Sequence, residues 1–253
     1  DSLERLFKTD PIGFAAVILE PTGLCEPEDG FLERVRELCD QYGVVLVFDE
    51  IVTGFRVDMG GAQRKYGVTP DLATFGKAMA NGMPISTIVG KREIMKLMDD
   101  IFFSGTFGGE TLSLAAALAT ITKLEKINAP EVFERTGRTI RDAVQSIITD
   151  FELDDIVSVA GVDWWPRIVV EAYGKNSQIE MTTLLRQELI EQGIFMGGGF
   201  NLSIAHNDES VIAETLHGIH QSFEKFSKYL KTDNPVSNLR GELIKPVFQV
   251  RSI

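Results

Sequence analysis

Short apolar runs alternate with amphipathic stretches through the first half of this 253-residue chain. Two of the runs, residues 15–19 and 44–48, are each followed directly by an acidic residue. Between them, apolar side chains recur at helical spacing over residues 31–42, with Asp29 as the expected N-cap and Gly43 as the stop. The pattern predicts a strand, a helix and a second strand, and the second strand is expected to be buried on both faces, as strands of parallel sheets are.

The same periodicities predict the remaining elements. Further strands are expected at residues 72–75, 85–89, 155–162, 167–172 and 200–205. Further helices are expected at residues 62–66, 93–98, 110–126, 130–149, 181–191 and 212–230. The regular alternation in the first part indicates a three-layer α/β architecture with a mostly parallel sheet, and the mixed order that follows indicates a smaller α+β domain. We expect the division at residues 1–140 and 141–230, with a polar tail at 231–253 that packs along the surface.

Composition narrows the kind of protein. Hydrophobic residues make up 44% of the chain and charged residues 25%, and no apolar run approaches the length of about 20 residues that a membrane span needs. The net charge of −12 argues against a nucleic-acid binder that works by phosphate neutralisation. Two cysteines and the lack of a signal-peptide pattern fit a reducing cytoplasm. Because the chain begins at Asp1 rather than at a methionine, we expect a missing N-terminal segment of the same protein.

The candidate chemistry lies at the ends of two predicted strands. Asp49 and Glu50 follow the run at residues 44–48, and Lys77 follows the run at residues 72–75. The separation is about that of one strand, a crossover and a return strand, so both side chains could emerge at the carboxyl edge of one sheet, where ligands bind. A carboxylate and an amine would then face one crevice.

Several alternatives are open for an acid at a strand end. It can be a satisfied structural carboxylate, a metal-holding acid or a partner for a cationic cofactor ring. The pattern is also typical of the magnesium-holding strand of P-loop ATPases, but the G-x-x-x-x-G-K-[ST] motif is absent from the chain, so that alternative places the phosphate loop in the missing segment. The histidines His206, His217 and His220 have no carboxylate cluster nearby in sequence, and we expect no metal site.

Two longer motifs favour the cofactor hypothesis. Residues 48–56 (FDEIVTGFR) and 67–77 (GVTPDLATFGK) closely resemble the signature of class III pyridoxal-phosphate (PLP) aminotransferases, nearest to the subgroup that includes glutamate-1-semialdehyde aminomutase. Residues 16–21, 30–32, 60–63, 105–106 and 201–206 are similar in order and spacing, so the resemblance covers about residues 11–230. It implies a PLP-dependent transferase of the aspartate aminotransferase-like fold type I, with residues 1–140 in the large domain.

The resemblance also implies residue roles. Lys77 would form the Schiff base with PLP and then move a proton as general base. Asp49 would pair with the pyridinium nitrogen of the cofactor. Ile51 would pack against the ring, and Thr106 would bind the cofactor phosphate across a dimer interface, ahead of a helix whose free N–H groups favour an anion. Glu50 and Arg56 also match the signature, and structural ion pairing is the role predicted for them.

The implied function is transfer of an amino group between an amine and a carbonyl substrate, such as an amino acid, an amino aldehyde or an amino-sugar-like molecule. A 2,1-aminomutase uses the same cofactor steps and is the alternative; a catalytically inert fragment that keeps the fold is another, against which the intact Lys77 argues. The implied assembly is a homodimer with the site at its interface. The family's N-terminal half, with its phosphate loop and stacking aromatic residue, would complete the site. Residues 21–27 are shorter than the family's usual segment, which predicts a changed substrate contact there.

Overall fold

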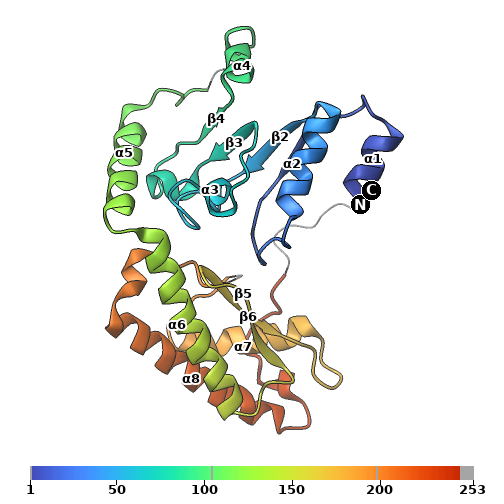
Figure 1. Cartoon of the computed structure of the whole chain (residues 1–253). Coiled ribbons are helices and arrows are strands. Elements are labelled where there is room, and N and C mark those ends of the chain that lie inside the picture. Colours follow the sequence, from blue (N-terminus) through green and yellow to red (C-terminus); the bar gives the residue numbers. More distant parts are fainter. Residues whose placement is uncertain (1, 104, 198, 246–253) are drawn as a thin grey trace. The chain divides into compact units, whose positions relative to one another are not determined.

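The computed structural model describes residues 2–103, 105–197 and 199–245. The chain forms two compact units, Asp1–Glu134 and Arg135–Ile253, each of which is described here by itself (Figure 1). Of the predicted tail at 231–253, residues 246–253 lie outside the described part. The finer division at residue 140 stays a prediction.

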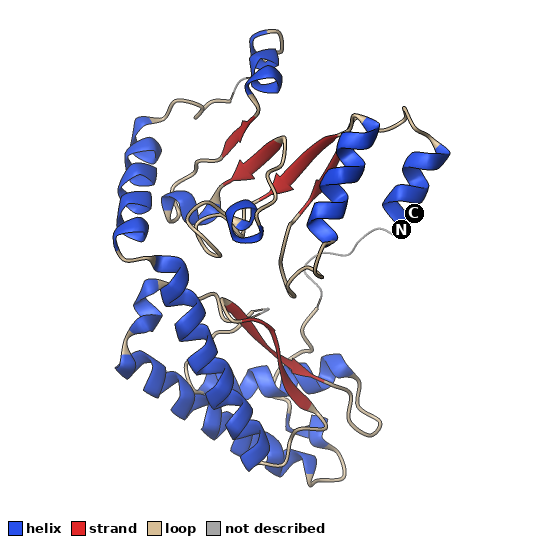
Figure 2. Cartoon of the chain, in the orientation of Figure 1, coloured by secondary structure: helices blue, strands red, loops and turns tan. Residues whose placement is uncertain are grey.

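A four-stranded sheet forms the centre of the first unit (Figure 2). Its strands, in spatial order, are β1 (Ala16–Leu19), β2 (Val45–Asp49), β3 (Leu72–Phe75) and β4 (Thr87–Gly90). β1, β2 and β3 are parallel to one another, and β4 pairs antiparallel with β3. The α/β class with a mostly parallel sheet, predicted from the alternation of apolar runs and helices, is therefore confirmed.

The helices of this unit alternate with the strands, and some of them bury side chains against one face of the sheet. They are α1 (Ser2–Thr9), α2 (Phe31–Tyr42), α3 (Ala62–Tyr66), α4 (Arg92–Met95), α5 (Thr111–Lys126) and the 3₁₀ helices η1 (Lys77–Ala80) and η2 (Lys96–Asp99). Leu46 and Phe48 of β2 are completely buried in a cluster with α2, and Ala73 and Phe75 of β3 pack with Ala117 of α5. These strand residues all point to the same face, because side chains alternate along a strand.

The opposite face of the sheet is only partly covered in the described chain. Val45 and Val47 of β2 are half-buried, and Ile18 of β1 is 65% exposed. The expectation that the run at residues 44–48 is buried on both faces is therefore wrong for this chain. The reason is that α2 and α5 contribute their apolar side chains to the other face.

Three local predictions for this unit also need correction. α2 has Gly30 rather than Asp29 as its N-cap, because the backbone takes a left-handed turn at Gly30 with φ 77°, which glycine adopts without strain. Phe31, expected on the buried face, is 48% exposed, while its neighbour Leu32 is buried. The helix expected at residues 93–98 is split into the short α4 and the 3₁₀ helix η2.

The second unit combines a hairpin with long helices. Its elements are α6 (Ala129–Asp150), which begins in the first unit, β5 (Val157–Val162), β6 (Trp165–Val170), α7 (Gln178–Glu191), the 3₁₀ helix η3 (Ile204–Asn207), α8 (Glu209–Leu230) and the 3₁₀ helix η4 (Pro235–Asn238). β5 and β6 pair antiparallel, and α7 packs against both α8 and β6. This is the predicted α+β arrangement. The strand boundaries lie about two residues from the predicted ones.

The strand predicted at residues 200–205 is wrong. Irregular backbone leads there into η3. The Nδ1 atom of His206 lies 2.9 Å from the backbone nitrogen of Ser203 and 3.0 Å from its hydroxyl, and it accepts a hydrogen bond from the backbone N–H. Such local side-chain bonds satisfy the backbone without a neighbouring strand, so an apolar alternation alone does not make a strand here.

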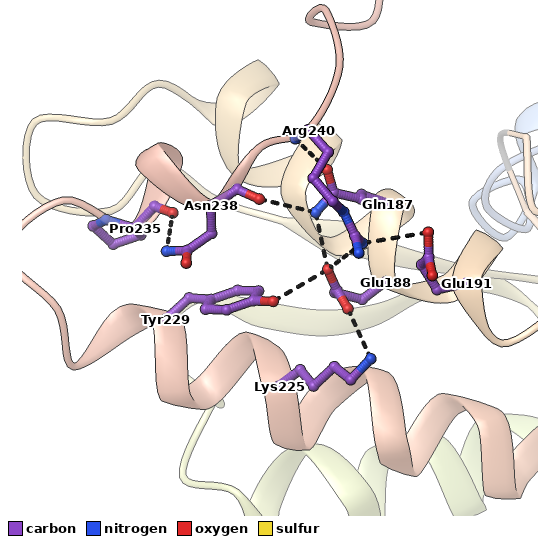
Figure 3. Close-up of polar contacts among 8 residues, drawn as sticks. All are labelled: Gln187, Glu188, Glu191, Lys225, Tyr229, Pro235, Asn238 and Arg240. Carbon is purple, nitrogen blue, oxygen red and sulfur yellow. Dashed lines mark hydrogen bonds and ion pairs between the residues drawn. The ribbon is translucent and has the colours of Figure 1, made fainter.

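Within the second unit, a buried carboxylate on α7 holds the segment around Arg240 against this helix (Figure 3). Glu188 of α7 is completely buried, and its Oε1 accepts a hydrogen bond from Arg240 Nη2 at 3.0 Å, while Lys225 Nζ lies 3.4 Å from its Oε2. The backbone N–H of Arg240 donates to Gln187 Oε1 at 2.7 Å. Burial, and then the Glu188 charge, raise the pKa of Tyr229. Lys225 and Arg240 therefore compensate the buried negative charge of Glu188.

Candidate active site

Asp49 and Lys77 leave the carboxyl ends of two neighbouring parallel strands. Asp49 is the last residue of β2, and its register partner on β3 is Thr74. Lys77 follows Gly76 immediately after β3 and begins η1. β2 and β3 lie side by side (Figure 1), and adjacent strands are about 4.8 Å apart, so the backbones that carry the acid and the amine leave neighbouring strand ends. The predicted placement at one edge of one sheet is thus confirmed for both residues.

The Asp49 carboxylate is held in one orientation. Its Oδ1 accepts a hydrogen bond from the backbone N–H of Ile51 at 3.0 Å and another from the hydroxyl of Thr74 at 3.2 Å. In the part of the chain that the structure describes, no donor contacts Oδ2. The half-buried carboxylate therefore has one oxygen fixed by the protein and one available to an external N–H.

Lys77 has an unusual backbone and an unpaired side chain. Its φ is 39°, in the left-handed region, which costs a residue other than glycine about 1 kcal/mol or more. Strain of this kind collects at functional sites. The exposed ammonium makes no hydrogen bond or ion pair with any described residue. A β-carbon on the preceding Gly76 would lie 3.8 Å from Ile51 Cγ2, so the Ile51 side chain lies beside the backbone that leads into Lys77.

An apolar cluster anchors the backbone around Lys77. Met79 and Ala80 of η1 are buried and pack with Phe75 of β3 and Ala117 of α5. The 3₁₀ turn is closed by the N–H of Met79, which donates to the carbonyl of Gly76 at 2.9 Å. The lysine therefore stands on a packed turn rather than on a free loop.

Glu50 has a structural role that differs from the predicted one. It is completely buried, and its carboxylate accepts hydrogen bonds from the Thr53 hydroxyl at 2.5 Å and from the backbone N–H groups of Ala62 at 2.8 Å and Gln63 at 3.0 Å. The expected ion pair is thus wrong, because Glu50 caps α3 instead. A β-carbon on Gly61 would lie 2.5 Å from Glu50 Oε1, which explains the glycine at that position.

Replacing Glu50 with glutamine is expected to lower the free energy of unfolding by about 2 kcal/mol, the scale of lost hydrogen bonds to a charged group. The amide nitrogen would point a donor at backbone donors. Urea unfolding measures the change, and the exposed Glu28, replaced by glutamine, serves as the matched control. Equal stability of the two variants would contradict the cap.

Arg56 lies within the same unit. Its guanidinium carbon is 5.2 Å from the centre of the Phe133 ring, a cation–π arrangement. Burial lowers the pKa of Arg56. The contact with the Phe133 ring was not predicted, and the structural ion pairing expected for Arg56 stays a prediction.

Thr106 is exposed in the turn that precedes α5. The turn is closed by the N–H of Gly108, which donates to the carbonyl of Gly105 at 3.0 Å. The first N–H groups of α5 are not free, because Glu110 accepts from Leu112 and Ser113 at 2.6 and 2.7 Å. Hydrogen bonds to Ser113 and Leu112 lower the pKa of Glu110. The role of Thr106 stays a prediction, and Ser104 lies outside the described residues.

The remaining sequence candidates give no competing site. His206 bonds Ser203, His217 lies 2.9 Å from Gln221, and the His220 ring packs against Phe151. No group of three metal-ligating side chains occurs within residues 2–103, 105–197 and 199–245. Over the same residues, none of the helices is both long enough and apolar enough to cross a membrane.

The fold is that of PLP-dependent transaminases. A solved structure described as a transaminase with PLP bound aligns with a TM-score of 0.76 over 87% of this chain and 54% of that chain, at 24% sequence identity. Residues 1–201 match the model of the aminotransferase class-III family, and the chain belongs to that family. The predicted family is thereby confirmed.

Two curated relatives have different names at the same similarity. The chain is 35% identical over 239 residues to a 3-aminobutyryl-CoA aminotransferase of Cloacimonas acidaminovorans (strain Evry), covering 91% of this chain and 57% of the relative. It is 35% identical over 243 residues to a glutamate-1-semialdehyde 2,1-aminomutase of Alkaliphilus oremlandii (strain OhILAs), covering 90% and 56%. The chain thus spans little more than half the length of these relatives.

Proposed function

We propose that the protein to which this chain belongs is a PLP-dependent aminotransferase that moves an amino group from an amine donor to a carbonyl acceptor. The observation that carries the proposal is the pair formed by Asp49 and Lys77 at neighbouring strand ends. Family membership supports it. The same membership favours this function over the P-loop ATPase alternative.

The chemistry of the side chains fits PLP. Asp49 offers to a protonated ring nitrogen a carboxylate oxygen that accepts no hydrogen bond from the described residues. Lys77 offers an unpaired amine to the aldehyde carbon, and Ile51 offers an apolar contact to the ring. When bound, PLP supplies an electron sink that stabilises negative charge on the substrate carbon next to nitrogen. Thr106 is proposed to bind the phosphate.

The protein side chains then have distinct tasks. Asp49 keeps a proton on the ring nitrogen, because a negative charge at hydrogen-bond distance favours the charged form of the ring. Lys77 Nζ, once neutral, takes the proton from the substrate carbon that bears the amino group. It would then deliver this proton to the carbon of the cofactor that was the aldehyde. Gly76 and Ala78 leave space beside the lysine in which its amine can move. Ile51 shields one side of this space from water.

An aminomutase is the second candidate, favoured by the equal identity to a relative with that name. The two functions differ in what leaves the protein. A transaminase releases a carbonyl product after the first half of the reaction, whereas an aminomutase returns the amino group to another carbon of the same molecule. The substrate proposed in either case is an amino acid, an amino aldehyde or an amino-sugar-like molecule.

We also propose a cytoplasmic homodimer in which a further segment of the same protein completes the site. Exposed apolar side chains in the first unit support this proposal, because a partner subunit or a further segment would cover them. Phe102 is 96% exposed, and Leu118 of α5 is 71% exposed. Both cysteines are free, which suits a reducing compartment. The net charge of −12 supports small-molecule rather than nucleic-acid partners.

The test is a half-reaction with the full-length protein. The PLP-loaded protein is mixed with a series of amine donors in the absence of any acceptor, and the visible spectrum and the released carbonyl product are followed. One carbonyl product per site, with loss of the visible band, is expected for a transaminase. Isomerised amine without released carbonyl product would assign the aminomutase. No spectral response to PLP at all would reject both.

A further inference from the structure

Thr74 lies opposite Asp49 across the ladder between β2 and β3. The two residues are register partners in a parallel pair, so their side chains point to the same, half-exposed face of the sheet. The N–H of Glu50 donates to the carbonyl of Thr74 at 3.0 Å, which fixes the two backbones at this position. The hydroxyl of Thr74 then donates to Asp49 Oδ1 at 3.2 Å.

Two donors converge on a single oxygen of Asp49. One is the Thr74 hydroxyl and the other is the backbone N–H of Ile51, at 3.0 Å. The terminal torsion of an aspartate has a broad distribution, so a lone carboxylate at a strand end is free to rotate. Donors from two different strand ends select one rotation. They leave Oδ2 without a hydrogen bond from any described residue.

We propose that Thr74 is a positioning residue, whose hydroxyl orients the Asp49 carboxylate toward a protonated ring nitrogen. The inference rests on the proposed function for the identity of the ligand. Thr74 acts only through Asp49 and touches neither the substrate nor the reacting atoms. Loss of the hydroxyl leaves Oδ1 with one donor, and the carboxylate then spends less time in the orientation that receives the ring.

A purely structural role makes a different prediction. Threonine is a favoured strand residue because of its branched shape, and valine keeps that shape without the hydroxyl. If Thr74 only packs, Thr74→Val changes stability slightly and leaves cofactor binding alone. If it positions Asp49, the same variant keeps its fold and loses cofactor affinity.

The experiment compares Thr74→Val, Thr74→Ser and the control Thr87→Val in the full-length protein. Thr87 on β4 pairs with Phe75, so it belongs to the same sheet but points to the other face. The dissociation constant of PLP is measured by visible titration, and kcat and KM for the amine donor are measured separately. Thr74→Val is expected to weaken PLP binding about tenfold, the effect of one hydrogen bond to a charged group, and to lower kcat with little change in KM.

The serine variant keeps the hydroxyl and is expected to bind PLP within about twofold of the wild type, as is Thr87→Val, since neither loses the hydrogen bond. Thr74→Ala supplies the same hydroxyl loss if the valine variant does not fold. Wild-type PLP affinity in Thr74→Val, or equal impairment of the valine and serine variants, would overturn the inference while the proposed function stands. A wild-type protein that gives no visible band with PLP would overturn both.

Discussion

Replacement of Lys77 with alanine is expected to lower kcat/KM by about 10⁴-fold, the upper range for loss of a positioned general base. The side chain would be lost both as the group that binds the aldehyde carbon and as the group that moves the proton. The fold should persist, because the apolar cluster of Met79 and Ala80 with α5 holds the turn, and alanine tolerates φ 39° no worse than lysine does. Steady-state kinetics and thermal unfolding measure the two effects.

Two further variants isolate the role of the amine. Lys77→Arg keeps a positive charge but cannot release a proton at neutral pH, so its activity should be as low as that of the alanine variant. Lys96→Ala removes an exposed lysine elsewhere in the first unit and should leave activity unchanged. An added small primary amine should restore part of the activity of Lys77→Ala. An arginine variant with near wild-type activity would show that Lys77 transfers no proton.

Replacement of Asp49 with asparagine is the second large effect that we expect. Losing one member of a hydrogen-bonded charge pair costs about 2–5 kcal/mol, which corresponds to a rate decrease of about 30-fold to about 5,000-fold. The amide cannot keep a proton on the ring nitrogen, but its oxygen can still accept from Ile51 and Thr74. The loss should therefore fall on kcat more than on stability. Steady-state kinetics and denaturant unfolding of the same preparation measure the loss of kcat and the loss of stability separately.

The control for Asp49→Asn is Asp29→Asn. Asp29 is exposed and precedes the N-cap of α2 without capping it, so its replacement removes one negative charge far from the strand ends in sequence. A similar loss of activity in both variants would point to net charge rather than to the ring partner. Full activity of Asp49→Asn would remove Asp49 from the site.

The order of elements and the main site pair could be predicted from the sequence because both depend on local patterns. A short apolar run followed by a charged residue predicts a parallel strand and its ligand-binding edge, and the positions of Asp49 and Lys77 follow from two such strands. The same logic failed at residues 200–205, where the His206 ring satisfies the backbone at Ser203. Burial of one face of β2 was also overestimated, since burial depends on which helices cover the sheet.

The contacts that orient the site could not be read from spacing. Glu50 caps α3 through a loop of about ten residues, a contact that needs the tertiary path of the chain. The sequence has one weak signal of this contact. Gly60 and Gly61 stand directly before α3, and consecutive glycines there allow another group to approach the backbone closely. Thr74 is hidden in an apolar run, and its relation to Asp49 follows only from the register of β2 and β3. Motifs therefore indicated the candidate reactive groups, and the three-dimensional structure showed what holds Asp49 and the backbone at Lys77.

Chemical mapping of the cofactor attachment point gives the most direct test of the central claim. The full-length protein is loaded with PLP, reduced with borohydride, digested, and the modified peptide is sequenced by mass spectrometry. We expect a single stable adduct on Lys77 and loss of the visible absorbance on reduction, with no adduct in Lys77→Ala. An adduct on another lysine, or none on the wild-type protein, would contradict the assignment of Lys77 and with it the proposed chemistry.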